Sequence, residues 1–379
     1  MKVMIFSGGY LPAKKYGGPV ASLVNFVETL GDDFDIDIVC LDHDLHDTTP
    51  FPDIKPGFNA VGKAQVLYIK NEDRNINSFR KIIKDRKPDC LYLSSIFDYK
   101  LNLPLLRLAK QYKLKVIYAP RGELADNTMK LGALKKNLFL FAMRLSGLYK
   151  NIYFQATNDN ERKDVLKRLS VPENMVYTLP NIASSVAIPK ENIGKEKGSL
   201  RIIFLSRIHK SKNLFYAINC AKKLSGNIIF DIYGPKEHGN YWSECENAIK
   251  TAPDNVKISY CGAVDPDKSK ITFGQYDCFL FPTVSENFSQ AIAESVLAGT
   301  VPVISRGTTP WDDINEQGGF TIPLENPDGF TAVLQNLCDM TTEEYVSVYN
   351  KLCEYRKIKL DNSALKKKYQ EMFSEVTGI

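Results

Sequence analysis

The chain has 379 residues, of which 44% are hydrophobic and 25% are charged, with a formal net charge of +5. This length favours two domains over one, the mild charge does not indicate a nucleic-acid partner, and no apolar run approaches the roughly 20 residues that cross a bilayer. The eight cysteines form no CxxC pair or repeated spacing, which indicates reduced thiols. We therefore expect a cytoplasmic protein that begins with a strand rather than a signal peptide.

Short apolar segments alternate with helical patterns along most of the chain, which predicts a parallel α/β sheet in each half. In the first half we expect a helix at residues 19–30 and strands at residues 2–7, 36–41, 64–69, 90–93, 115–119 and 152–156. In the second half we expect strands at residues 201–205, 228–233, 256–260, 278–281 and 301–304. A lysine-rich helix at residues 363–377 is predicted to end the chain.

Residues 183–199 have no clear period and contain Pro189, Gly194, Gly198 and several charges, which is typical of a linker. The predicted organisation is a first Rossmann-like domain and a second one joined by this linker, with a final helical segment. The boundaries are 1–182, 183–199, 200–360 and 361–379.

A glycine pair, Gly17 and Gly18, lies between the first strand and the first helix. Glycines at a helix entrance let the backbone approach a diphosphate closely, although a simple turn is the alternative. The loop does not match the G-x-G-x-x-G fingerprint of dinucleotide enzymes, which disfavours a nicotinamide-dependent or epimerase-type enzyme.

Two histidines, His43 and His46, stand among aspartates directly after the second predicted strand. Such a cluster could suggest a metal site. The segment, however, is predicted as a surface loop without the geometry that makes ligands converge. We therefore expect a solvated loop and no metal.

Basic and large apolar side chains mix over residues 130–150. The basic ones are Lys130, Lys135, Lys136, Arg144 and Lys150, and the apolar ones are Leu134, Leu138, Phe139, Phe141 and Leu148. A basic amphipathic helix suits an anionic membrane surface and a lipid-linked acceptor. Alternatively its apolar side belongs to the core and its lysines are merely solvated, and the sequence leaves both readings open.

A basic loop follows the first strand of the second half. Arg207 and Lys212 lie five residues apart, so both can converge on a diphosphate, whereas Lys210 is expected to be a solvated neighbour. Gly234 and Gly262 then end the next two strands in glycine turns, where α/β sheets bind ligands.

Residues 279–305 predict a strand, a loop, a helix and another strand. Ser289 is expected to cap the helix N-terminus with its hydroxyl, and Gly299 to end the helix in a left-handed conformation. Ile292 and Val296 share one face of the helix and are predicted to be buried.

Two glutamates frame this helix tip, because Glu286 stands in the preceding loop and Glu294 lies eight residues later. A helix N-terminus attracts phosphate oxygens, and carboxylates accept hydrogen bonds from hydroxyls. The combination predicts a sugar nucleotide as ligand. The alternative is a surface helix with two unrelated acids.

The segment from Glu286 to Glu294 resembles the Glu-x7-Glu motif of the retaining glycosyltransferases of family 4, which have the GT-B fold. The resemblance implies two Rossmann-like domains that face each other across a cleft, with the last helix crossing back to the N-terminal, acceptor-binding domain. It assigns the sugar hydroxyls to Glu286 and the ribose to Glu294. The amides of Asn287, Phe288 and Ser289 would meet the sugar and diphosphate, although many relatives have glycines at the first and last of these.

The other family elements are assigned in the same way. Arg207 and Lys212 resemble the Arg-x4-Lys element that neutralises the leaving diphosphate, Gly17 and Gly18 the loop beside the donor, and Gly234 the turn near the base. The Pro-Arg-Gly-Glu-Leu stretch that contains Arg121 and Glu123 resembles that of one subgroup, whereas many members have a histidine at the arginine. We expect Arg121 to face the cleft with Glu123 nearby. An ion pair between the two is the alternative.

The implied reaction moves a hexosyl group from a nucleoside diphosphate sugar to an acceptor hydroxyl with retained configuration, without metal or cofactor. Surface polysaccharide or lipopolysaccharide assembly, with a saccharide or lipid-linked acceptor, is the implied setting. This setting suggests a location at the inner face of the membrane and contact with anionic lipid. The alternatives are a non-catalytic sugar-nucleotide binding protein and a Rossmann-type enzyme that modifies nucleotide sugars.

Overall fold

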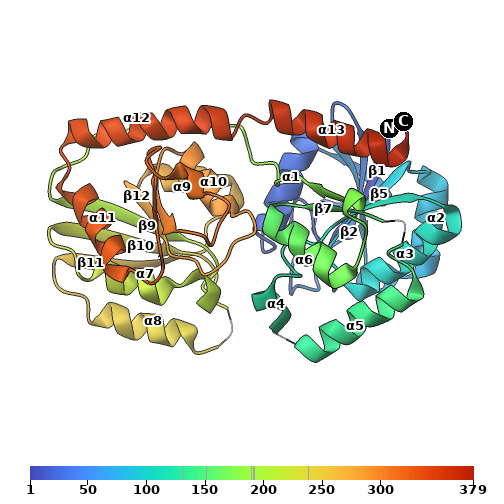
Figure 1. Cartoon of the computed structure of the whole chain (residues 1–379), viewed down its shortest axis with the longest axis horizontal. Helices are drawn as coiled ribbons and strands as arrows, with labels where there is room; N and C mark the ends of the chain where they lie inside the picture. The colour runs from blue at the N-terminus through green and yellow to red at the C-terminus, as the bar shows by residue number, and fades with distance from the viewer. Residues whose placement is uncertain (131, 151, 189, 191–192, 238) are drawn as a thin grey trace. The chain divides into compact units, whose positions relative to one another are not determined.

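The computed structural model describes residues 1–379 except 131, 151, 189, 191–192 and 238. The chain divides into two compact units, the first formed by Met1–Ile182 with Asn362–Ile379 and the second by Ala183–Asp361. Each unit contains one twisted sheet with helices packed against it (Figure 1).

The sheet of unit 1 has the strand order β3-β4-β2-β1-β5-β6-β7-β8, and all neighbours are parallel except β3 and β4. Its strands are β1 (Lys2–Phe6), β2 (Asp35–Leu41), β3 (Phe58–Val61), β4 (Ala64–Ile69), β5 (Cys90–Ser94), β6 (Lys115–Ala119), β7 (Tyr153–Ala156) and β8 (Val176–Thr178). The α-helices of the unit are α1 (Gly18–Leu30), α2 (Ile76–Arg86), α3 (Tyr99–Tyr112), α4 (Asp126–Lys130), α5 (Ala133–Ser146), α6 (Asp159–Leu169) and α13 (Ser363–Thr377).

Helix α13 brings the end of the chain back to unit 1. Tyr369 and Phe373 are buried against Phe26 of α1, with ring centroids 5.6 and 6.2 Å apart. The hydroxyl of Tyr369 donates to the carbonyl of Pro180 at 3.0 Å. The N- and C-termini consequently lie side by side (Figure 1).

The sheet of unit 2 is entirely parallel, in the order β11-β10-β9-β12-β13-β14. Its strands are β9 (Ser199–Leu205), β10 (Asn227–Tyr233), β11 (Val256–Gly262), β12 (Cys278–Phe281), β13 (Val301–Ser305) and β14 (Phe320–Ile322). Its α-helices are α7 (Leu214–Ala221), α8 (Tyr241–Lys250), α9 (Ser269–Gly274), α10 (Gln290–Leu297), α11 (Pro327–Asp339) and α12 (Thr342–Lys359).

Three short strands, β3, β8 and β14, are absent from the sequence-based prediction. Each has only three or four residues, too few to show a period. They lie at or beyond the edges of the predicted sheets, so their omission leaves the central strands unaffected.

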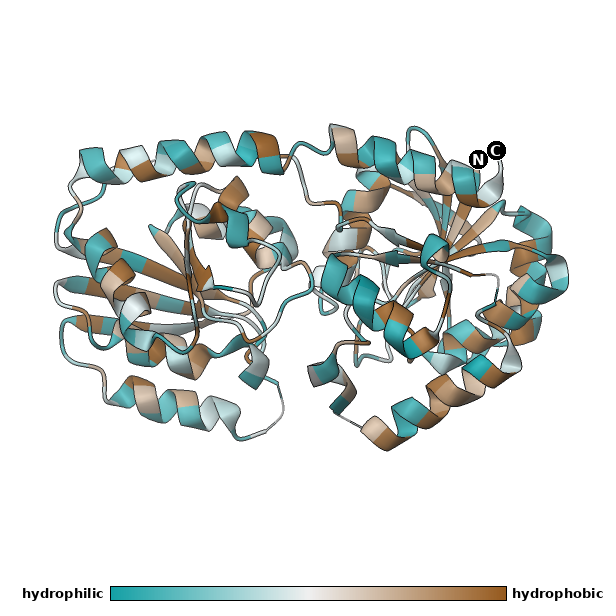
Figure 2. Cartoon of the chain, in the orientation of Figure 1, coloured by the Kyte–Doolittle hydropathy of each residue, from teal (hydrophilic) through white to brown (hydrophobic). Residues whose placement is uncertain are grey.

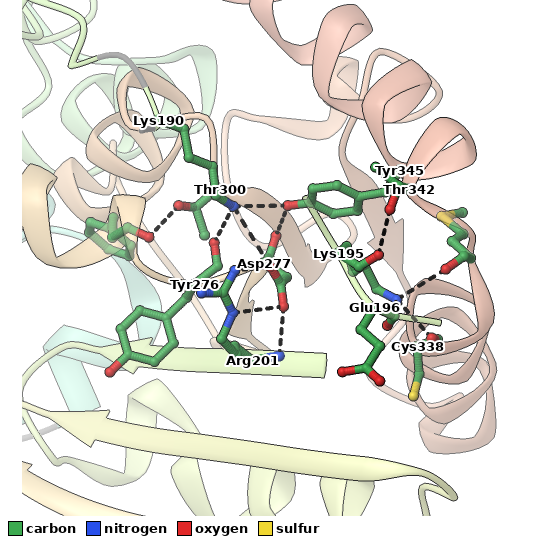
Figure 3. Close-up of polar contacts among 12 residues, drawn as sticks. Lys190, Lys195, Glu196, Arg201, Tyr276, Asp277, Thr300, Cys338, Thr342 and Tyr345 are labelled. Atoms are coloured by element: carbon green, nitrogen blue, oxygen red, sulfur yellow. Dashed lines mark hydrogen bonds and ion pairs between the residues drawn. The ribbon is translucent and has the colours of Figure 1, made fainter. Parts of the chain in front are cut away.

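Residues 183–199, predicted as a linker, lie within unit 2. Two buried lysines anchor this segment (Figure 3). Lys190 donates to the carbonyl of Tyr276 at 2.7 Å and to the hydroxyl of Tyr345 at 3.2 Å, and its Nζ lies 3.9 Å from Asp277. Lys195 donates to the carbonyl of Cys338 at 2.7 Å. The amines are satisfied inside the protein, so charges that suggest a solvated linker instead fix the segment to the domain.

The anchoring lysine is expected to make stability depend on pH. Burial lowers the pKa of Lys190 to about 8, below the value of about 10.4 of an unfolded lysine. Between these values the unfolded chain binds a proton that the folded chain lacks, so the contribution of Lys190 to stability rises with pH. The Tm of the wild type minus that of Lys190→Met should therefore be more positive at pH 9.5 than at pH 7. Lys197→Met, an exposed lysine of the same segment, should show no such trend, and equal trends would contradict the prediction.

Candidate functional site

The predicted donor site lies at the carboxyl edge of the sheet of unit 2. Successive strands run from β9 through β10 to β11 on one side, whereas β12, β13 and β14 follow on the other. The boundary between β9 and β12 is therefore a topological switch point, where open α/β sheets bind ligands. Lys212 follows β9 and Glu286 follows β12, so both stand at this boundary.

Lys212 and Glu286 form an ion pair between Nζ and Oε1, although they are 74 residues apart in sequence. Both side chains are largely buried. Thr283 donates from its hydroxyl to the same carboxylate oxygen at 3.0 Å. Because an ammonium group has three donors, Lys212 can keep this pair and still bind an anion.

Arg207 is placed differently from Lys212. Its guanidinium pairs with Glu237, in the loop after β10, and its side chain is largely exposed. Lys210 is also exposed and lies 3.6 Å from Glu244, in agreement with its predicted role as a solvated neighbour. Nothing in the sequence identifies Glu237 as a partner of Arg207, because the contact depends on how two loops meet.

Gly234 brings the loops after β9 and β10 together. Its φ is 137°, and a Cβ at this position would lie 1.9 Å from the carbonyl oxygen of Ser206. Two backbone hydrogen bonds join the loops on either side of this contact. The amide of Ser206 donates to the carbonyl of Tyr233 at 3.1 Å, and the amide of Ile208 donates to the carbonyl of Pro235 at 2.9 Å. The glycine thus positions the loop that carries Arg207, a function that sequence reasoning missed.

The loop before α10 is held by backbone and tryptophan contacts. The amide of Glu286 donates to the carbonyl of Thr308 at 2.7 Å. The indole of the buried Trp311 donates to the carbonyl of Phe288 at 2.5 Å. These contacts order the backbone that precedes the helix, and neither Trp311 nor Thr308 was expected from sequence to take part.

Ser289 occupies the N-cap position of α10, but the prediction that its hydroxyl caps the helix is wrong. Its φ is 69° and ψ is 88°, and its side chain makes no cap hydrogen bond. Side-chain capping requires extended backbone, whereas this left-handed conformation favours glycine. At the other end Gly299, with φ 70°, confirms the predicted helix stop, and Ile292 and Val296 are buried as expected.

Glu294 belongs to α10, and its partly buried side chain faces α9. Burial raises its pKa to about 6, although hydrogen bonds from Ser269 and Gln290 and the charge of Lys270 oppose the increase. The carboxyl group is therefore poised to change charge close to neutral pH.

Gly17 and Gly18 stand at the N-terminus of α1, as predicted. The φ of Gly17 is 60°, and a Cβ at either glycine would meet no atom within 4 Å. Their backbone is thus open on the side where a side chain would stand. Contact with a donor remains a prediction.

Arg121 and Glu123 have separate partners, so the alternative of an ion pair between them is wrong. The guanidinium of Arg121 donates to Asn181, to Ser22 at 3.3 Å and to the hydroxyl of Tyr92 at 2.9 Å. Arg121 is thus held by unit 1 itself, with a left-handed φ of 56°.

Glu123 turns to the loop after β5 instead. Its carboxylate accepts from the hydroxyl of Ser95 at 2.6 Å and from the amide of Phe97 at 3.1 Å, while burial raises its pKa. Glu161 of α6, which sequence reasoning missed, accepts from Gly122 at 2.5 Å and from Thr157 at 2.7 Å. It is a buried carboxylate that supports the turn between Arg121 and Glu123.

The prediction of a solvated loop around His43 is wrong for its first residues. Asp42 and His43 are buried, and Nδ1 of His43 lies 2.6 Å from the carboxylate of Asp42. The other ring nitrogen lies 3.3 Å from the amide nitrogen of Asn71. The pair therefore fixes the end of β2.

The described residues show neither a membrane-spanning helix nor a metal site. They contain no helix that combines the length and the apolar character needed to cross a membrane. Among the residues that the structure describes, no three His, Cys, Asp or Glu side chains come together in a way that could hold a metal ion.

The sequence profile described as "Glycosyl transferases group 1" matches residues 185–351, which is most of unit 2. The O-antigen biosynthesis glycosyltransferase WclY of Escherichia coli is 22% identical over 334 residues, covering 83% of this chain and 84% of the relative.

The likeness to solved structures extends over both units. Anabaena HepE, crystallised with UDP and glucose, superposes with a TM-score of 0.74 at 13% identity, covering 99% of this chain and 100% of that one. Sucrose-phosphate synthase from Thermosynechococcus elongatus gives a TM-score of 0.76 at 12% identity, covering 100% and 99%. At such identities these likenesses show the fold, and they confirm the predicted pair of Rossmann-like domains. With a group 1 glycosyltransferase profile over its second unit, the chain is a glycosyltransferase with the GT-B fold.

Proposed function

We propose that the protein transfers a hexosyl group from a nucleoside diphosphate sugar to an acceptor hydroxyl and retains the anomeric configuration. The observation that carries this proposal is the ion pair of Lys212 and Glu286 beside the N-terminus of α10, at the switch point of the sheet. A cation for the diphosphate and a carboxylate for sugar hydroxyls are thereby held next to each other.

In the proposed reaction the bond between the anomeric carbon and the diphosphate oxygen breaks. The acceptor oxygen bonds to the same face of that carbon, and the acceptor proton passes to the leaving diphosphate. Stabilising the negative charge on the leaving group is then the main task of the protein. Lys212 and Arg207 supply positive charge, and the amides of Asn287 to Ser289 supply hydrogen bonds. We expect no metal or cofactor, because these groups take over that task.

Arg207 would have to exchange its partner when the donor binds. Its guanidinium is paired with Glu237 in the free protein and is otherwise exposed. A diphosphate carries more charge than one carboxylate and can bind the guanidinium in a bidentate manner. In this proposal Glu237 keeps Arg207 close to the donor site in the free protein and releases it when the diphosphate binds.

We infer the substrate class from the relatives. HepE was crystallised with UDP and glucose, so a UDP sugar is the first donor to test. WclY is named for O-antigen biosynthesis, which supports a saccharide acceptor, free or lipid-linked, in surface polysaccharide assembly. We place this reaction in the cytoplasm, at the inner face of the membrane.

The test is a screen of UDP, GDP and ADP sugars for transfer and for donor hydrolysis, followed by NMR of the anomeric proton of the product. We expect turnover of one donor with retained configuration, and loss of turnover in Glu286→Gln. An inverted product would contradict the mechanism. Binding of a sugar nucleotide without any turnover would favour a non-catalytic binding protein.

Binding of the nucleotide is expected to depend on the charge of Glu294. Because its pKa is raised to about 6, the carboxyl group is neutral at pH 5 and ionised at pH 7. An ionised carboxylate accepts hydrogen bonds from ribose hydroxyls more strongly than a neutral one, so affinity for UDP should rise about tenfold between these pH values. Calorimetric titration at several pH values measures this.

Two variants separate this effect from the titration of UDP itself. Glu294→Gln should bind weakly and lose the increase that is specific to Glu294. Glu244→Gln, an exposed glutamate of α8, should titrate like the wild type. If UDP affinity depends on pH in Glu294→Gln as it does in the wild type, the ionisation of Glu294 does not control UDP binding.

A further inference from the structure

Helix α5 carries a stripe of large apolar side chains that none of the residues described by the structure covers. Leu134, Leu138, Phe141 and Leu145 are 83%, 65%, 57% and 74% exposed. Their separations of four, three and four residues place them on one side of the helix. The stripe extends over about 17 Å along the helix axis. Single exposed apolar residues are common, but a continuous row of this kind marks a binding surface.

The stripe is distinct from the face that α5 packs on unit 1. Leu140 and Met143 are buried in the core, and Phe139 packs against it with its ring centroid 6.0 Å from that of Phe97. Lys136 also turns inward, where its amine donates to the carbonyl of Thr128 at 2.8 Å. The helix is therefore apolar on two opposite sides, and brown segments recur along it in Figure 2. The alternative that the apolar side of this segment belongs to the core is therefore right for Phe139 and Leu148, which pack against it, and wrong for the exposed stripe.

Positively charged residues flank the stripe, and the surrounding segment of the sequence has no acidic residue. Lys135 and Arg144 are exposed, and each lies three residues from a member of the stripe, at Leu138 and Phe141. The 32 residues from 127 to 158 contain five lysines and arginines and no aspartate or glutamate.

Helix α3 adds positive charge beside α5. Arg107 and Lys110 are exposed and line a shallow groove of about 510 Å³ between the two helices. On the other bank of the groove stand Ala142 and Ser146 of α5. The positive charge therefore continues from α5 onto the neighbouring helix.

We propose that this stripe, with its flanking cations, docks the protein on an anionic lipid bilayer. A helix that lies in the membrane interface inserts its apolar side between the acyl chains and places lysines and arginines at the level of the headgroups. Each cation near an anionic surface adds to the attraction, and the absence of acids over residues 127–158 removes the opposing term.

The same charges argue against a second copy of the chain as the occupant. A two-fold contact would lay the stripes of two copies together and bring their flanking cations face to face. No acid between residues 127 and 158 could compensate that repulsion. An anionic bilayer matches both the apolar row and its charged margins.

The experiment is co-sedimentation of the full chain with vesicles of phosphatidylcholine alone or mixed with about 30% phosphatidylglycerol. We expect binding to the mixed vesicles only, weakened when NaCl rises from about 0.05 to 0.5 M. The double variant Leu138→Ser/Phe141→Ser should lower the partition coefficient at least tenfold. Lys135→Gln/Arg144→Gln should lower it as well and flatten its salt dependence.

The matched control is Ile358→Ser on α12, since Ile358 is 81% exposed and stands between Lys357 and Lys359. This variant should bind vesicles like the wild type. As a local probe, Phe141→Trp should show a blue-shifted emission with mixed vesicles. All these readouts are independent of sugar transfer, so they stand even if the proposed function fails.

Three results would overturn the proposal. The first is absence of binding to the mixed vesicles, and the second is equal binding by the wild type and the double serine variant. The third is a dimer in solution that the double serine variant dissociates, without vesicle binding, which would assign the stripe to a second copy.

Discussion

Replacing Lys212 with alanine is expected to lower kcat for sugar transfer by about 10²–10³-fold, the effect of removing one group that stabilises developing negative charge. The ammonium group is held by Glu286 and by the cation–π contact with the ring of Phe281, 5.9 Å away. It is therefore already oriented before the donor arrives. The measurement is the initial rate at saturating donor, followed by release of the nucleoside diphosphate.

Lys210→Ala is the matched control, because Lys210 belongs to the same loop but is exposed and lies nearest to Glu244. It should keep nearly full kcat. The double variant Lys212→Ala/Glu286→Gln should lose less than the sum of the single losses, since each residue positions the other. If Lys212→Ala transfers sugar as fast as Lys210→Ala, the assignment of Lys212 to the leaving diphosphate is wrong.

The central strands could be predicted from sequence because each is a short, continuous apolar run between turn residues. In β12 all four residues are buried, as the continuous apolar run in the sequence predicts for a central strand covered on both faces. The pair of Lys212 and Glu286 could be anticipated for a related reason. Parallel strands bring their carboxyl ends to one edge of the sheet, so the loops that follow the neighbouring strands β9 and β12 start side by side.

What the sequence could not predict depends on contacts between loops and on backbone conformation. Glu237 is one of many exposed glutamates until the loop after β10 approaches Arg207. Ser289 has a residue type that suggests a side-chain cap, but it adopts a left-handed conformation. Arg121 is a cation whose partners, Ser22 and Asn181, are 99 and 60 residues away. Helical periodicity likewise shows that α5 has apolar sides but not which of them unit 1 covers.

Gly234 offers the second large effect, this time on stability and binding together. Gly234→Ala is expected to reduce the free energy of unfolding by about 3–5 kcal/mol. Its φ of 137° is rarely adopted by other residues, and the new Cβ would lie 1.9 Å from a backbone oxygen that no side-chain rotation can move away. Relieving this overlap must separate the loops after β9 and β10, so affinity for UDP should fall at least tenfold. Urea unfolding and calorimetric titration measure the two quantities.

Gly239→Ala distinguishes backbone strain from loss of the contact between the two loops. Gly239 has a φ of 123°, close to that of Gly234, and lies before α8 in the same connection, but its Cβ would meet no atom within 4 Å. Its replacement should cost only the strain, about 1–3 kcal/mol, and leave UDP binding nearly unchanged. If both variants lose equal stability and both still bind UDP, the approach of Gly234 to Ser206 does not position the loop of Arg207. If only Gly234→Ala loses UDP binding, the close approach of Gly234 to Ser206 is what positions the loop that carries Arg207.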